Sequence, residues 1–156
     1  MLAAAIALAL LAYPPQTTTG VLPDLAIGFN PPDGPGYVVA SKCEPGKPLI
    51  TFLLVISNVG SVNSQPIKEH DGVTIAAVDD PAWSAGAPLG AIAAGHIEAL
   101  NLSLPARPGL HGPYEVVITV NGRQEFEENS FANNTARVTV TIPPGFCPSV
   151  SARPGV

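Results

Sequence analysis

Eighteen prolines are distributed along this chain of 156 residues, and they limit its fold more than any other feature. A proline inside a helix removes a backbone hydrogen bond and clashes with the preceding turn, so long helices have little room. Apolar and polar residues instead alternate in short runs, such as residues 24–29 (DLAIGF), 114–120 (YEVVITV) and 136–142 (ARVTVTI). A period of two is that of a strand with one buried face. The pattern predicts an all-β protein of about seven antiparallel strands packed as a β-sandwich.

The remaining strands are expected at residues 37–40, 49–57, 72–78, 89–95 and 96–105. Residues 49–57 (LITFLLVIS) are apolar at nearly every position, which predicts a central strand that is covered on both faces or packed at an interface. Trp83, the only tryptophan, follows Asp79 and Asp80. Adjacent strand residues point to opposite faces, so these carboxylates should not converge on a sugar. We interpret the two aspartates as a loop entry and Trp83 as a core or edge anchor.

Acidic and amide side chains gather in residues 121–134 (NGRQEFEENSFANN), between the last two expected strands. Asn121-Gly122 predicts a tight turn. Residues 123–127 should then be extended, and residues 128–134 should form a second turn, because Asn side chains bond to nearby backbone groups. Oxygen ligands for calcium are the alternative, and they would come from Glu127, Glu128, Asn129, Asn133 and Asn134. Their spacing differs from that of an EF-hand, which favours a hydrogen-bonded corner.

Charged residues form only 12% of the chain, and the net charge is −5 with seven basic residues. Nucleic-acid binding needs clustered Lys and Arg, so it is not expected. No spacing of His70, His96 and His111 indicates a catalytic or metal site, and we expect no enzyme and no cofactor. A surface with so few charges is typical of proteins in assemblies, on cell surfaces or under glycans. Asn101 and Asn133 begin glycosylation triplets, and Asn133, on its turn, is expected to be the better exposed.

The two cysteines, Cys43 and Cys147, flank the first long apolar strand and the last strand. A disulfide between them would tie the C-terminal tail to the sheet and would indicate an oxidising, extracytoplasmic setting. Two buried free thiols are the alternative.

The chain begins with an apolar segment, residues 1–12, whose large side chains are Leu2, Ile6, Leu8, Leu10 and Leu11. It is too short for a stable membrane span, which needs about 20 residues. It is either a signal remnant, although it lacks a basic start, or an assembly segment that docks on a neighbouring subunit. The expected division is then a proline-rich linker (13–23), the sandwich (24–142) and a C-terminal tail (143–156).

Five short motifs in this order resemble the CARDB family, the cell-adhesion-related domain of bacteria and archaea. They are PDL (23–25), VISNVGS (55–61), LGAIAAG (89–95), GPYEVVITVN (112–121) and FEENSFANNT (126–135). The resemblance implies an immunoglobulin-like, usually non-enzymatic module of exported proteins. Phe131 replaces the acidic residue that the family has before its final Asn pair, which weakens any transfer of calcium binding.

Two functions fit these observations best. The first is a non-enzymatic structural protein of the extracellular surface, which assembles with copies of itself into a filament, sheath or layer through residues 1–12 and the faces of the sandwich. The second is an adhesion or binding module that recognises a glycan or a surface protein through the turns around Trp83 or Asn129–Asn134. A third alternative, a hydrolase accessory domain, would require a catalytic domain on the same polypeptide.

Overall fold

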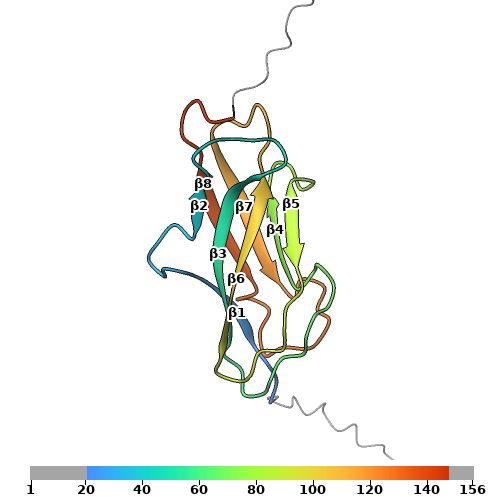
Figure 1. Cartoon of the computed structure of the whole chain (residues 1–156). Coiled ribbons are helices and arrows are strands. Elements are labelled where there is room, and N and C mark those ends of the chain that lie inside the picture. The colour runs from blue at the N-terminus through green and yellow to red at the C-terminus, as the bar shows by residue number, and fades with distance from the viewer. Residues whose placement is uncertain (1–20, 148–156) are drawn as a thin grey trace, which may run out of the picture.

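Two antiparallel sheets pack face to face in the computed structural model, which describes residues 21–147 (Figure 1). The strands are β1 (Leu25–Phe29), β2 (Tyr37–Val39), β3 (Pro48–Asn58), β4 (Val73–Ala77), β5 (Ser84–Ala87), β6 (Ile97–Pro105), β7 (Pro113–Val120) and β8 (Thr135–Thr141). The predicted all-β sandwich is confirmed, with eight strands in place of about seven. The assembly residues Leu2, Ile6, Leu8, Leu10 and Leu11 lie outside the described residues, as do most of the linker and the end of the tail.

The first sheet is built around β3. This strand pairs with β6 along one edge, while β1 and β2 share its other edge. The expectation of a central strand at residues 49–57 is therefore confirmed. Alternate β3 side chains, such as Phe52 and Leu54, point into the core and are at most 1% exposed, and those between them are half-buried on the outer face.

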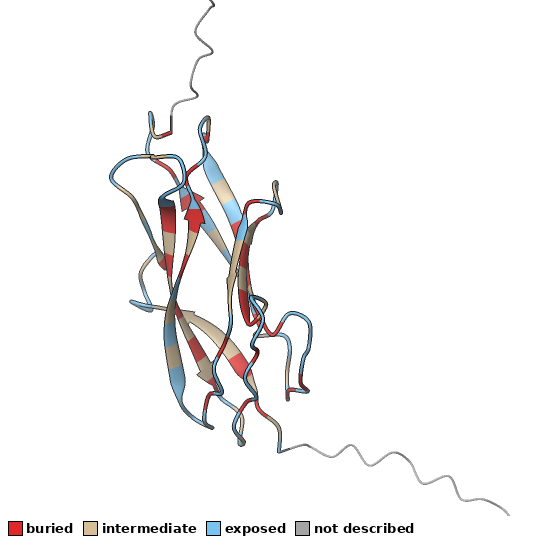
Figure 2. Cartoon of the chain, turned by 45° about the vertical axis from the view of Figure 1, so that its right-hand side comes forward, coloured by how far each residue is buried: buried red, intermediate tan, exposed pale blue. Residues whose placement is uncertain are grey.

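The second sheet has the strand order β5-β4-β7-β8. Val116, Ile118 and Val120 of β7 are fully buried, as the alternation in the sequence predicted. On the outer side, Arg137 of β8 pairs with Glu115 of β7 at 2.6 Å. Buried residues alternate with more exposed ones along the strands of both layers (Figure 2). The described part of the chain contains no helix with the length and apolarity needed to cross a membrane.

Two local predictions were wrong. Residues 89–95 form a loop, not a strand, and only Leu89 makes an isolated bridge, to Ile67. Leu89 and Ile92 are buried and anchor the loop in the core, while Gly90 and Ala91 between them are exposed. The backbone of Ile92 is satisfied by Ser64, whose N–H donates to the Ile92 carbonyl and whose hydroxyl accepts from the Ile92 N–H.

Residues 123–127 are also not extended. Asn121 and Gln124 have positive φ angles of 46° and 55°, so the chain turns twice. This double turn brings Phe126 into the core, where it is 7% exposed. The tight turn expected at Asn121-Gly122 is present, and it continues directly into the corner that precedes β8.

The described chain begins at the end of the sandwich where β1 starts, and it finishes at the opposite end (Figure 1). The end where β1 starts holds the acidic and amide corner, and the other end holds Cys43 and Cys147. Most candidate sites expected from the sequence therefore lie at one end or the other.

Candidate functional site

Glu128 is the centre of the acidic and amide corner, and it is 7% exposed. One carboxylate oxygen accepts hydrogen bonds from the side-chain amides of Asn121 and Asn134, at 2.6 and 2.8 Å. The other accepts the backbone N–H of Leu25 at 2.6 Å. Glu128 thereby fastens the start of β1 to the end of β7 and the start of β8, which joins the two sheets at this end.

Asn121 continues this network. Its side-chain oxygen accepts the backbone N–H of Glu125 at 2.8 Å. The Asn121 side chain therefore stabilises the turn that begins at Asn121. Asn tolerates the left-handed conformation better than most residues, which explains its position at φ 46°. Asn133 donates from its side-chain nitrogen to Asp24 at 2.7 Å and makes a second link to the β1 entry.

The five residues proposed as calcium ligands do not share one environment. Glu127 and Asn129 are exposed, and Asn129 donates to the carbonyl of Leu22 at 3.1 Å. Both oxygens of Glu128 already accept N–H groups. Within residues 21–147, no group of three or more His, Cys, Asp or Glu side chains is placed to hold a metal ion. The hydrogen bonds of Glu128 favour a hydrogen-bonded corner, and within the described residues the buried side-chain oxygens of Asn133 and Asn134 accept none.

Asn58 is a further buried amide at this end of the sandwich, and it was not identified as important from the sequence. It ends β3 with no exposed surface and uses its whole side chain. Its oxygen accepts the N–H groups of Asp24 and Gly60, and its nitrogen donates to the carbonyls of Val62 and Ile92. The available signal was an Asn at the end of an apolar run, directly before Val-Gly-Ser.

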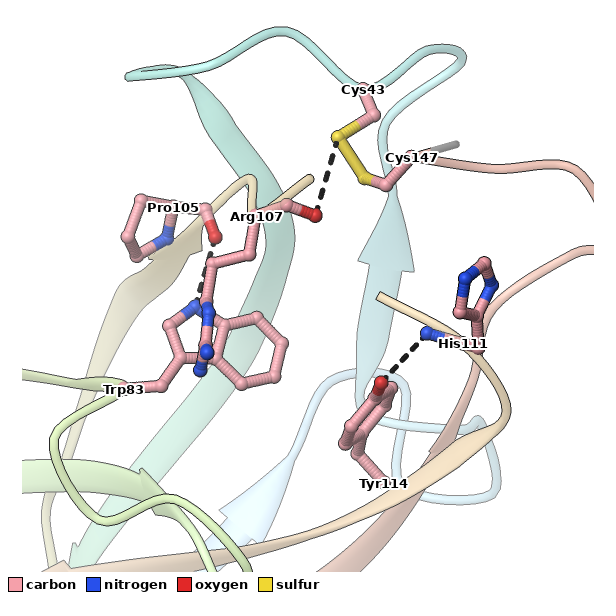
Figure 3. The surroundings of a disulfide bond; sticks show 7 residues. All are labelled: Cys43, Trp83, Pro105, Arg107, His111, Tyr114 and Cys147. Carbon is pink, nitrogen blue, oxygen red and sulfur yellow. Dashed lines mark hydrogen bonds between the residues drawn. A yellow bond between two sulfur atoms is a disulfide. The ribbon is translucent and has the colours of Figure 1, made fainter. Parts of the chain in front are cut away.

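The opposite end of the sandwich contains the predicted disulfide between Cys43 and Cys147 (Figure 3). Beside Cys43, the carboxylate of Glu44 pairs with Lys47 at 2.6 Å and with Lys42 at 3.2 Å. These two hydrogen-bonded ammonium groups, Lys47 foremost, lower the pKa of Glu44 below its usual value. Glu44 therefore keeps its charge to a lower pH than an isolated glutamate.

Trp83 lies below this disulfide and is 4% exposed, so its interpretation as a core anchor is confirmed. The indole nitrogen donates to the carbonyl of Pro105 at 2.9 Å, and the ring meets Tyr114 edge to face at 5.6 Å. Arg107 lies over the indole, 5.9 Å from the ring centroid, and pairs with Asp80. The tryptophan face is therefore covered and is not a free platform for a sugar.

A shallow depression of about 160 Å³ remains beside Trp83. Its lining residues include Asp79, Asp80, Arg107, Leu110 and Tyr114. It combines carboxylates, a guanidinium and an aromatic ring, the kinds of group that bind polar ligands.

The two asparagines that begin the glycosylation triplets differ in solvent exposure, and the more exposed one is not the one that was predicted. Asn101 is exposed on β6. Asn133 is half-buried, and the side-chain nitrogen that would carry a glycan donates to Asp24. The expectation that Asn133 is the better exposed of the two was therefore wrong, because the corner uses its amide.

The outer surface of β1, β3 and β6, here called the β1–β3–β6 outer face, is defined by alternate residues in register across the three strands. Its residues are Ala26, Gly28, Thr51, Leu53, Val55, Ser57, Ile97, Ala99, Asn101 and Ser103. None of these side chains is charged, and Ile97 is 66% exposed. The other sheet presents mainly threonines and the Glu115–Arg137 ion pair on its outer side, so the two outer surfaces differ in chemistry.

No family model matches this chain, and no curated protein matches it. Among solved structures, it is similar to the crystal structure of the CARDB domain of the PF1109 protein from Pyrococcus furiosus, in complex with di-metal ions. The identity is 17% and the TM-score is 0.50, over 78% of this chain and 94% of that chain. A solution NMR structure of the same domain matches with 16% identity and a TM-score of 0.46, over 77% and 94% of the two chains.

The chain is thus an immunoglobulin-like β-sandwich. More particularly, its fold is that of a CARDB domain, which confirms at the level of the fold the resemblance carried by the five sequence motifs.

Proposed function

We propose that this chain is a non-enzymatic structural protein of the extracellular surface, which assembles with copies of itself into a filament, sheath or layer. The observation that carries the proposal is the β1–β3–β6 outer face. A solvated face of an antiparallel sheet is normally polar. Here Leu53 and Val55 stand at its centre, Ile97 stands exposed at its edge, and no charged side chain interrupts it. Exposed apolar patches of this kind mark contact surfaces.

Three further features support an assembly outside the cell. The disulfide between Cys43 and Cys147 favours an oxidising compartment. The described chain begins and finishes at opposite ends of the sandwich, which suits head-to-tail contacts, and such contacts make open filaments when the rotation does not close. The CARDB-like fold supports an exported, cell-adhesion-related module.

Residues 1–12 supply a second apolar surface in this proposal. Full burial of one Leu or Ile side chain is worth about 1.5–3 kcal/mol, so the five large side chains together contribute roughly 8–15 kcal/mol before ordering costs. Association costs an estimated 4–15 kcal/mol in lost freedom. The two ranges overlap, so the gross contribution of the segment is of the same order as the cost of association, and contacts of the sandwich faces add to it.

Electron microscopy of native, unrefolded material tests the proposal directly. We expect regular filaments or sheets, and we expect deletion of residues 1–12 to give monomers with an unchanged circular dichroism spectrum, because the deletion leaves the whole described sandwich intact. Discrete monomers of the full chain would contradict the proposal and would favour a signal remnant at the N-terminus.

The alternative is a cell-surface binding module that recognises a glycan or a protein. The depression around Asp80, Arg107 and Tyr114 supports it, because polar and aromatic groups converge there. A binding module would keep its affinity on a glycan array after deletion of residues 1–12, whereas an assembly would collapse. Substitution Arg107→Ala would then lower the affinity, and substitution Arg123→Ala, at the other end of the sandwich, would leave it unchanged.

A further inference from the structure

The β1–β3–β6 outer face contains a trough. Gly28, Val55 and Ala99 lie in one register row across the three strands, and two of the three have a small side chain or none. The other lining residues of the hollow are Ile97 of β6 and Phe29, Asn30 and Pro32 at the end of β1. The resulting hollow has a volume of about 530 Å³ and is lined mainly by carbon atoms. Its size is that of a pocket that accepts several side chains.

The chain carries an apolar segment whose chemistry matches this trough. Residues 2–12 are Leu, Ala and Ile only, with no charged or hydrogen-bonding side chain. The trough likewise presents no charged side chain. Burying the two surfaces against each other leaves no side-chain charge without a partner, so the hydrophobic contribution is not offset by desolvation of ions.

We propose that the trough binds the apolar N-terminal segment, residues 2–12, of a second copy of this chain. The inference rests on the proposed function, which it deepens by naming the acceptor surface. Each copy then offers one segment and one trough, and this pairing of two different surfaces propagates from copy to copy.

The composition of the linker, and not its length, favours a second copy over the chain's own trough. Leu22 is fixed, because its carbonyl accepts hydrogen bonds from Ser61 and Asn129. The nine residues between Ala12 and Leu22 span about 30 Å when extended. Gly28 lies six residues beyond Leu22, which is at most about 20 Å along the chain. To reach that trough the linker would have to reverse direction, which its Pro14-Pro15 pair, extended by preference, opposes.

The floor of the trough provides a variant that should fold normally. A β-carbon added at Gly28 would meet its nearest neighbour, the carbonyl oxygen of Val55, at 3.6 Å, which is ordinary contact. Valine also favours strands more than glycine does. Gly28→Val therefore fills the trough without adding charge, and Ile97→Lys places a charge beside it. Val59→Lys is the matched control, because Val59 is 62% exposed in the turn after β3 and does not line the trough.

Sedimentation velocity on the full chain and its variants is the first test. We expect Gly28→Val and Ile97→Lys to lower the association constant at least about tenfold, the effect of losing one well-packed contact. Val59→Lys should assemble like the wild type. If the wild type assembles and Gly28→Val assembles equally well, the trough is not the acceptor and the inference fails, while the proposed function stands.

A mixing experiment distinguishes the two surfaces. The chain lacking residues 1–12 keeps the trough, and the Gly28→Val chain keeps the segment. Each alone should be monomeric, and together they should form a one-to-one complex that grows no further, detected by native mass spectrometry. The inference would be overturned if the two chains formed no complex. It would also be overturned if the wild-type segment cross-linked to its own trough, or if the chain lacking residues 1–12 formed dimers. A wild type that never assembles, or whose mature form lacks residues 1–12, would overturn the proposed function as well.

Discussion

Glu128 is a buried carboxylate whose hydrogen-bond partners are backbone and amide N–H groups from three parts of the chain. Substitution Glu128→Gln keeps the shape but leaves one acceptor oxygen, so an NH₂ group must face at least one N–H donor. An unsatisfied buried group and the lost charge-assisted bonds predict a decrease of about 2–3 kcal/mol in the free energy of unfolding. Urea denaturation followed by circular dichroism measures this change.

Glu127→Gln is the control for that substitution, because Glu127 is the exposed neighbour and should change stability by less than about 0.5 kcal/mol. The alternative of a calcium site predicts a different result. Calcium would then raise the Tm of the wild type, and Glu128→Gln would abolish the rise. A hydrogen-bonded corner predicts the same Tm with calcium and with a chelator.

The sequence identified this corner but not the roles of its members. Five acidic and amide residues were equivalent candidates, and only Glu128 and Asn134 of them are buried. Glu128 differs from its exposed neighbour Glu127 because it accepts the N–H of Leu25, which is 103 residues distant in sequence. No local pattern contains that contact. The exposure of Asn133 was misjudged for the same reason, since its partner Asp24 is 109 residues away.

At the scale of the elements, the alternation of apolar and polar residues predicted the strands that have one face packed on the core, such as β1, β7 and β8. The strand expected at residues 89–95 is instead a loop, whose buried residues Leu89 and Ile92 are three positions apart and not two. The alternation also missed β5, whose sequence, SAGA, is short and made of small residues. Residues 84–87 form a strand because they pair with the edge of β4. Such pairing depends on both segments, so the sequence of one segment does not predict it.

The disulfide acts at this scale, because it joins the segment before β3 to the segment after β8. It closes a separation of 104 residues in the unfolded chain. The double substitution Cys43→Ser with Cys147→Ser should therefore lower the free energy of unfolding by about 2–4 kcal/mol. Urea denaturation of the wild type with and without a reductant measures the same difference. A reductant that also destabilises the double variant would show that the effect does not come from this bond.

At the scale of the whole molecule, the sandwich has two chemically different outer surfaces. The sequence showed that both faces of β3 are apolar. This indicated that its outer face is either covered by other parts of the chain or packed against another molecule. The trough was not visible, because it depends on the register that sets Gly28 and Ala99 on either side of Val55. Register follows from pairing across the sheet, so the surface becomes recognisable only once the three strands are aligned.

The chemistry of these surfaces predicts how assembly responds to salt. Copies with a net charge of −5 repel one another, and the Debye length falls from about 10 Å at 0.1 M salt to about 3 Å at 1 M. The proposed contact contains no charged side chain, so salt weakens the repulsion without weakening the contact. Sulfate should strengthen it further, and cooling should weaken it, as expected for apolar burial. Light scattering of the wild type should therefore rise between 0.1 M and 1 M sodium chloride. Dissociation over the same range would mean that ion pairs, and not the uncharged face, hold the copies together.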